Sequence, residues 1–90
     1  MTYIRWETPD QEVYPFYTPP VASAYVGRLN VGHINKDGKT YDCSYVLMGD
    51  GLEIKRKRAK NLPSEEVARM LVEQSAALVI NALQNDIPAP

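Results

Sequence analysis

The fold is decided by residues 64–85, SEEVARMLVEQSAALVINALQN, where apolar side chains recur at the spacing of an α-helix. Pro63 and Ser64 mark the start of this helix, because proline fits a first helical turn and serine caps its free amide groups. Asn85 and Pro88 end it. The apolar residues form two rows: Val67, Leu71, Leu78 and Ala82, and Ala68, Val72, Ser75 and Val79.

This helix has more apolar surface than one sheet requires. Between Met70 and Gln84 the only charged residue is Glu73, whereas a surface helix ordinarily carries a charged face. The second side must therefore be covered by the N-terminal aromatic residues, by another protein or by a second copy of the chain. We expect a homodimer or a tight complex, with close helix contact through four mostly small residues: Ala76, Ala77, Ile80 and Leu83.

Upstream of the helix the sequence predicts three antiparallel strands, over about 24–34, 39–48 and 52–60. The turn between the first two is centred on Asp37-Gly38, and the second turn on Asp50-Gly51, both common hairpin sequences. The fold class is therefore α+β: a three-stranded antiparallel β-meander followed by one long C-terminal α-helix packed on one sheet face.

The turn lengths predict a register. Val31 should oppose Cys43, and Leu47 should oppose Ile54. The buried face would then hold Leu29, Val31, Cys43, Tyr45, Leu47, Leu52 and Ile54, and the outer face Arg28, Asn30, Ser44, Glu53, Lys55 and Lys57. A second turn one residue longer would instead place Ile54 beside Val46 on the outer face.

The first twenty residues differ from the rest, since they hold five of the eight aromatic residues and four of the seven prolines. Proline at this density prevents a helix or a central strand. We predict an irregular N-terminal arm over residues 1–23, with residues 2–7 as an optional extra edge strand. Residues 24–86 form the βββα domain, and residues 87–90 a tail.

The chain has 90 residues, enough for one domain, and a single cysteine, so it has no internal disulfide. This fits a reducing compartment, and the first residues lack the pattern of a signal peptide. The longest apolar run, Ala76–Ile80, is far shorter than a membrane span. We expect a small cytoplasmic protein without a membrane partner.

Catalytic and metal-binding residues are scarce. His33 and Cys43 would be diagonal neighbours on the buried sheet face, but the thiol would lie under the helix and no third residue would orient the imidazole. A core cysteine beside a half-buried histidine is the better interpretation. One His and one Cys cannot form a zinc site, and Gly49-Asp50-Gly51 lacks the lysine of a phosphate-binding loop. We expect no enzyme, no cofactor, no metal and no small-molecule substrate.

The clearest functional signal is a basic run, because five of the ten basic residues lie in residues 55–60. Residues 1–54 carry four basic and seven acidic residues, and residues 61–90 carry one and four. Such a run contacts phosphates or an acidic partner, or protects a sheet edge from aggregation. The candidate contact residues are Arg28, Asn30, Ser44, Lys55, Arg56, Lys57, Arg58 and Lys60.

Two functions are consistent with these features. The apolar helix and the aromatic arm favour a non-enzymatic regulatory or inhibitory protein that binds another protein, as a homodimer or in a stoichiometric complex. The basic run favours a nucleic-acid-binding module that uses the outer face of the sheet.

Overall fold

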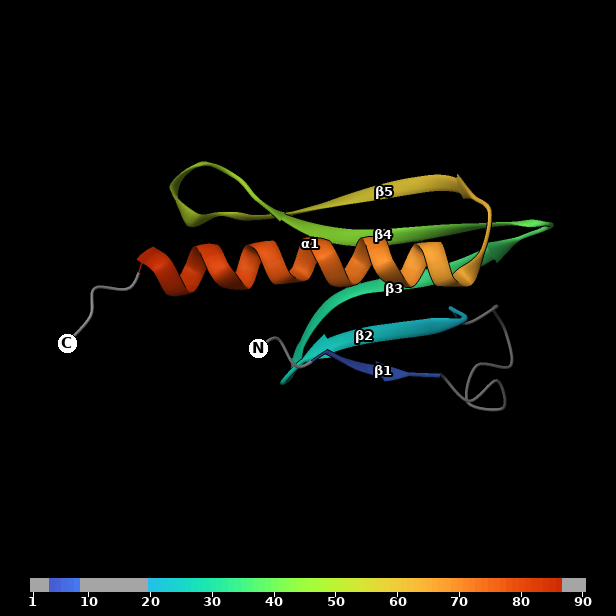
Figure 1. Ribbon diagram of the computed structural model, residues 1–90, viewed down its shortest axis with the longest axis horizontal. Helices are drawn as coiled ribbons and strands as arrows, with labels where there is room; N and C mark the ends of the chain where they lie inside the picture. Colours follow the sequence, from blue (N-terminus) through green and yellow to red (C-terminus); the bar gives the residue numbers. More distant parts are fainter. Residues whose placement is uncertain (1–3, 9–19, 87–90) are drawn as a thin grey trace.

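The structure, a computed structural model, describes residues 4–8 and 20–86. It is an α+β fold in which a five-stranded antiparallel sheet is followed by one long C-terminal helix packed against it (Figure 1). Each strand pairs with the next one along the chain, in the order β1-β2-β3-β4-β5. The elements are β1 (Arg5–Glu7), β2 (Ala22–Val26), β3 (Leu29–Asp37), β4 (Thr40–Met48), the short 3-10 helix η2 (Asp50–Leu52), β5 (Ile54–Leu62) and α1 (Glu65–Asp86).

The predicted meander and helix are confirmed, but the sheet has five strands where three were predicted. The segment predicted as one strand over 24–34 is split into β2 and β3 by a tight turn at Gly27-Arg28. Gly27 has a φ of 61°, a conformation that glycine adopts without steric cost. The optional edge strand at residues 2–7 exists as β1, which pairs with β2. Most of the predicted arm and the tail lie outside the described residues.

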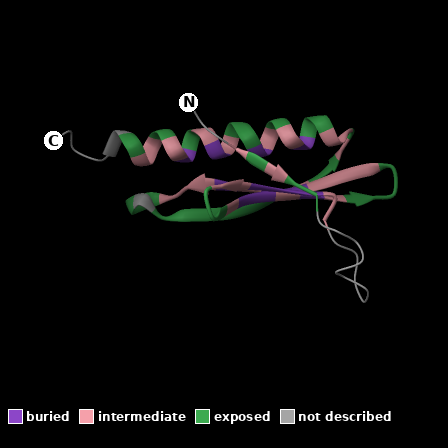
Figure 2. Cartoon of the chain, turned by 90° about the horizontal axis from the view of Figure 1, so that it is seen from below, coloured by how far each residue is buried: buried purple, intermediate pink, exposed green. Residues whose placement is uncertain are grey.

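Helix α1 covers one face of the sheet and buries small and β-branched residues against it (Figure 2). On the helix, Ala68, Val72 and Ala76 are fully buried. On the sheet, the close approach is made at Gly32, where a Cβ atom would lie 2.8 Å from Cγ1 of Val72. Glycine at this position therefore lets the helix backbone approach β3. The other buried apolar residues are Ala22, Ala24, Val31, Ile34, Cys43, Val46 and Val79.

The predicted register between β3 and β4 is wrong. The connecting turn is Gly38-Lys39, closed by the pair Asp37 and Thr40, so Cys43 opposes Ile34 and not Val31. Gly38 has a φ of 63°, which suits the first position of a two-residue hairpin turn. Of the core residues predicted on β3, Val31 is buried at 2% exposed but Leu29 is 49% exposed, and Ile34, which opposes Cys43, is fully buried instead.

The register between β4 and β5 also differs by one residue. The connection spans 49–53 and includes η2, so Ile54 opposes Met48 and not Leu47. Ile54 is 39% exposed and shares the face of Val46, as the alternative longer turn predicted. The side chain of Leu52, assigned to the core from sequence, lies outside the described part of the structure. In β4 the prediction holds for Cys43, which is buried, and for Tyr45, which packs against the core, but Val46, predicted on the outer face, is 1% exposed.

Candidate nucleic-acid interface

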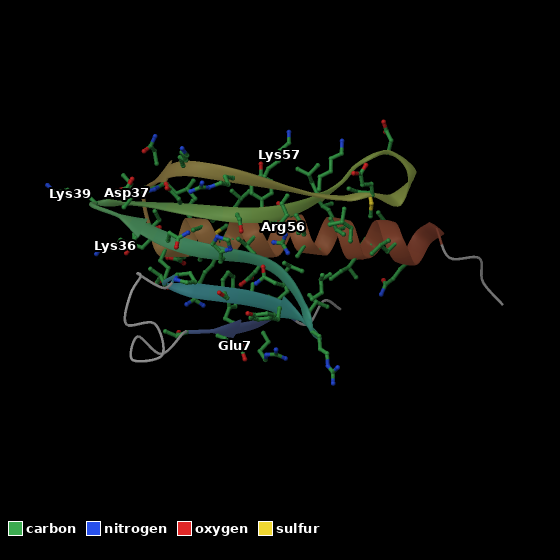
Figure 3. All side chains as sticks on the ribbon, turned by 180° about the vertical axis from the view of Figure 1, so that it is seen from behind. Glu7, Lys36, Asp37, Lys39, Arg56 and Lys57 are labelled. Carbon is green, nitrogen blue, oxygen red and sulfur yellow. The ribbon has the colours of Figure 1, made fainter. Side chains whose placement is uncertain are left out.

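The face of the sheet turned away from α1, here called the open face, is not covered by any element of the described residues (Figures 1 and 2). Figure 3 looks onto this face. The N-terminal strand packs its aromatic residue on the other side, where Nε1 of Trp6 donates a hydrogen bond of 2.9 Å to Glu73 on α1. The open face is therefore the larger uncovered surface on which to look for a binding site.

One continuous row of polar residues crosses the open face from edge to edge. Direct cross-strand pairs join its members, and directly opposed residues project on the same side of a sheet. Its central residue follows Gly32, which faces the helix, so the row projects away from α1. The row, here called the polar row, consists of Glu7, Ser23, His33, Ser44 and Arg58.

At the centre of the polar row, Ser44 holds the His33 side chain. The Ser44 hydroxyl oxygen accepts the backbone N–H of His33 at 3.2 Å and lies 3.0 Å from Nδ1 of the same imidazole. Ser44 is only 6% exposed, so its hydroxyl has little contact with water. The two bonds fix both the position of the ring and the nitrogen that remains for other contacts.

The charge state of His33 is also set by its surroundings. Burial lowers the pKa of His33 below its ordinary value of 6.5, and the nearby guanidinium groups of Arg56 and Arg58 lower this pKa further. The imidazole is therefore neutral at pH 7. A neutral imidazole has one nitrogen that donates and one that accepts.

Arg56 reaches from the edge strand β5 across the sheet. Its two terminal nitrogens donate to Asn30 on β3, one to the side-chain oxygen at 3.1 Å and the other to the backbone oxygen. The side chain must therefore cross β4, where Val46 is directly opposite Arg56 and is 1% exposed. Figure 3 shows Arg56 lying over the sheet while Lys57 points outward at the β5 edge.

A hollow of about 470 Å³ lies where these side chains meet. Three of its five lining residues are cations and none is an acid; they are His33, Ser44, Arg56, Lys57 and Arg58. At the opposite edge of the face, Arg5 forms an ion pair of 3.5 Å with Glu7, which neutralises that end. The uncompensated positive charge of the open face therefore gathers at β5.

The structure brings together only part of the predicted contact set. Asn30, Ser44, Arg56 and Arg58 share the open face, but Lys55 and Lys57 alternate to the other side because β5 is shifted by one residue. The grouping of Lys55 with Asn30 and Ser44 on one face is therefore a wrong prediction, whereas Lys57, from the β5 edge, still lines the hollow together with Ser44. Arg28 lies in the β2–β3 turn and Lys60 further along β5, and neither lines the hollow.

Sequence reasoning missed His33 as a member of this surface. It placed His33 and Cys43 on one buried face, whereas His33 pairs with Ser44, and Cys43 with Ile34, on opposite faces. Burial raises the pKa of the Cys43 thiol, the opposite of what a nucleophile requires. Within the described residues there is no group of three or more His, Cys, Asp or Glu that could hold a metal ion.

The predicted helix surface is also partly wrong. Ala76 is fully buried against the sheet and Leu83 packs on the core, so they are not available as a group for a second helix. Ile80 is half-buried, and Ala77 lies beside Ile4 of the N-terminal segment. The exposed apolar residues of α1 are Val67, Met70 and Leu78, at 38%, 52% and 71%.

No family model, no curated protein and no solved structure matches this chain. Of the helices in residues 4–8 and 20–86, none is long and apolar enough to cross a membrane. The function must therefore be argued from the surface of the molecule itself.

Proposed function

We propose that the protein is a non-enzymatic nucleic-acid-binding module that contacts the sugar–phosphate backbone through the open face of its sheet. The observation that carries this proposal is the placement of Arg56 and Arg58 on one uncovered face, beside a neutral histidine and without an acid in the hollow they line. Guanidinium groups bind phosphate oxygens with paired hydrogen bonds, and Asn and Ser commonly add neutral contacts.

The shape of the charged region favours a polymer over a small anion. All five basic residues of β5 lie on a nine-residue strand at the edge of the sheet, and every one of them is exposed. At about 3.4 Å per residue, such a strand is about 30 Å long, a length that spans several nucleotides. Because Arg56 and Arg58 point to the open face and Lys55 and Lys57 to the other side, a backbone following β5 would meet cations on both sides of the strand over residues 55–60.

The test is fluorescence anisotropy with labelled duplex DNA, duplex RNA and single strands at several salt concentrations. We expect micromolar binding that weakens steeply with salt, because phosphate contacts release counterions. The variant Arg58→Gln leaves the bonds between Arg56 and Asn30 intact and should reduce the salt slope by about 1. Lys39→Gln, an exposed cation in the β3–β4 turn, is the matched control and should change neither value. Absence of binding to duplex DNA, to duplex RNA and to the single strands at low salt would refute the proposal.

A second candidate function follows from the exposed apolar residues of α1. Leu78 is 71% exposed, and it lines a hollow of about 290 Å³ with Met48 and Val79. This favours a regulatory or inhibitory protein that binds another protein, or a second copy of itself, through the helix. Analytical ultracentrifugation at several protein concentrations tests the self-association. A monomer at every concentration would contradict the homodimer.

A further inference from the structure

Within the proposed interface, we propose that the hollow lined by His33, Ser44, Arg56, Lys57 and Arg58 is a subsite for a single phosphate group, with His33 as a neutral hydrogen-bond donor to it. This inference rests on the proposed function, since it names the part of the open face at which one phosphate is held. It adds a residue, His33, that the charge pattern of the sequence does not reveal.

The hydrogen bonds of Ser44 determine which ring nitrogen of His33 is free. A serine hydroxyl has one hydrogen and two acceptor lone pairs. One lone pair accepts the backbone N–H of His33, and the hydroxyl hydrogen is free to be donated to Nδ1. In a neutral imidazole whose Nδ1 accepts, Nε2 carries the proton. The subsite requires this tautomer, in which Nε2–H is a donor to a phosphate oxygen; the other tautomer, with Nδ1–H donating to the second lone pair of Ser44, would present an acceptor.

Arg56 is already oriented for the same ligand. Its bonds to the side chain and backbone of Asn30 employ two of the five N–H groups of the guanidinium and fix its plane. Three N–H groups remain, so the side chain loses little conformational freedom when an anion binds. Arg58, directly opposite Ser44, supplies a second guanidinium at the β5 side of the hollow.

The lining also indicates that the ligand group is a phosphate and not a base. None of the five lining residues is a Phe, Tyr or Trp, the large rings on which bases stack best, and the ring edge of His33 is bonded to Ser44. The donors of the hollow are the guanidinium groups of Arg56 and Arg58, the ammonium group of Lys57 and the free ring nitrogen of His33, while the Ser44 hydroxyl is engaged by His33. A compact anion with several acceptor oxygens satisfies this set, and the phosphate is either a backbone diester or a terminal monoester.

Protonation of His33 should strengthen anion binding. The charged groups nearest to it are Arg56 and Arg58 from β5, while β2 and β4 present Ser23 and Ser44, and Glu7 of β1 follows Ser23 in the polar row. A bound anion offsets the repulsion from the two arginines, so by linkage it must raise the pKa of His33. The affinity should therefore increase as the pH falls from the pKa of His33 in the bound protein to its lowered pKa in the free protein.

The experiment is an NMR titration of the full chain with sulfate and with inorganic phosphate, followed at the ring signals of His33. Sulfate keeps its charge from pH 5 to 8, so any pH dependence belongs to the protein. We expect saturable shifts of the His33 ring in the millimolar range, a higher His33 pKa with sulfate bound, and tighter sulfate binding at lower pH. Sulfate shifts confined to Lys39 and other exposed lysines, with His33 unaffected, would overturn the subsite.

Variants separate a ligand contact from a structural role. Ser44→Ala removes the bond to Nδ1 and should weaken sulfate binding about tenfold, a loss of about 1.4 kcal/mol. His33→Gln keeps a neutral N–H donor, so it should retain binding at pH 7 and lose the increase at low pH. If Ser44→Ala also lowers stability, the decision rests on His33→Gln. If sulfate binding to His33→Gln still becomes tighter at low pH, His33 is not part of the site. Lys39→Gln again serves as the control.

A pair of oligonucleotides identifies the source of the phosphate. Two identical single strands, one with a 5′-phosphate and one with a 5′-hydroxyl, distinguish a terminal monoester from a backbone diester. If the wild type prefers the phosphorylated strand and Arg58→Gln loses that preference, the hollow binds the terminal phosphate. If the wild type binds both strands with equal affinity and Arg58→Gln weakens both equally, the hollow binds the backbone. Nucleic-acid binding that is unchanged in Ser44→Ala, and that keeps the same pH dependence in His33→Gln, would sink the subsite but leave the proposed function standing.

Discussion

At the scale of single residues, the contact between helix and sheet depends on Gly32. A Cβ atom there would lie 2.5 Å from the backbone oxygen of Ser44 and 2.8 Å from Cγ1 of Val72. Neither neighbour is the end of a flexible side chain, so the β3–β4 pair or the helix must shift. The same shift would disturb Ser44, which orients His33. Gly32 therefore supports both the core and the candidate site.

We expect Gly32→Ala to lower the free energy of unfolding by about 2 kcal/mol, as overpacked cores do. The measurement is urea unfolding followed by circular dichroism. The control is Gly49→Ala, where the nearest atom is Cε of the flexible, exposed Lys55 side chain and φ is −94°. This variant should stay within about 0.5 kcal/mol of the wild type. Equal effects at both positions would contradict a special role for Gly32.

At the scale of elements, two glycine turns decide the sheet. Gly27-Arg28 and Gly38-Lys39 each place a glycine with positive φ at the first position of a two-residue hairpin. Sequence reasoning correctly predicted the helix, the antiparallel meander and the edge position of the basic strand. It placed the turn at residues 35–38 and overlooked Gly27, so it joined β2 to β3 and shifted the register of β3 against β4.

The candidate site shows how strongly register controls a surface. The residue types of the site were found from sequence, but which of them share a face depends on a shift of one residue, because side chains alternate along a strand. The connection between β4 and β5 includes a turn of 3-10 helix, whose length the Asp50-Gly51 pair alone does not specify. Arg56 and Arg58 consequently replaced Lys55 and Lys57 beside Asn30 and Ser44.

The basic side chains of β5 have a second physical consequence, because β5 is an edge strand of nine residues. Lysine on an exposed edge discourages pairing with the edge of another molecule. We expect the double variant Lys55→Thr, Lys57→Thr to self-associate through β5, as measured by light scattering over hours at increasing concentration. The control Lys36→Thr, Lys39→Thr removes the same charge from the β3–β4 hairpin and should remain dispersed. Aggregation of both variants alike would attribute the effect to net charge and not to the edge.

At the scale of the whole molecule, two layers give two different outer surfaces. The sheet side carries a polar row and the guanidinium groups of Arg56 and Arg58, and the outward side of α1 carries Met70 and Leu78 (Figures 2 and 3). The chain as a whole has a net charge of −1, so its positive surface is local. A polyanion approaching this molecule should therefore bind in one orientation, with the helix turned away from it.

This arrangement predicts that the two surfaces can be inactivated separately. Leu78→Glu should change the free energy of unfolding by no more than about 0.5 kcal/mol, since the side chain is 71% exposed. It should abolish any self-association seen by sedimentation and leave the affinity for nucleic acid unchanged. Arg58→Gln should weaken nucleic-acid binding and leave any self-association unchanged. If Leu78→Glu weakened nucleic-acid binding as much as Arg58→Gln does, binding would require a dimer, because Leu78 lies on α1, which covers the face opposite to the hollow. Measuring both variants in both assays therefore decides whether one copy of the chain is sufficient to bind.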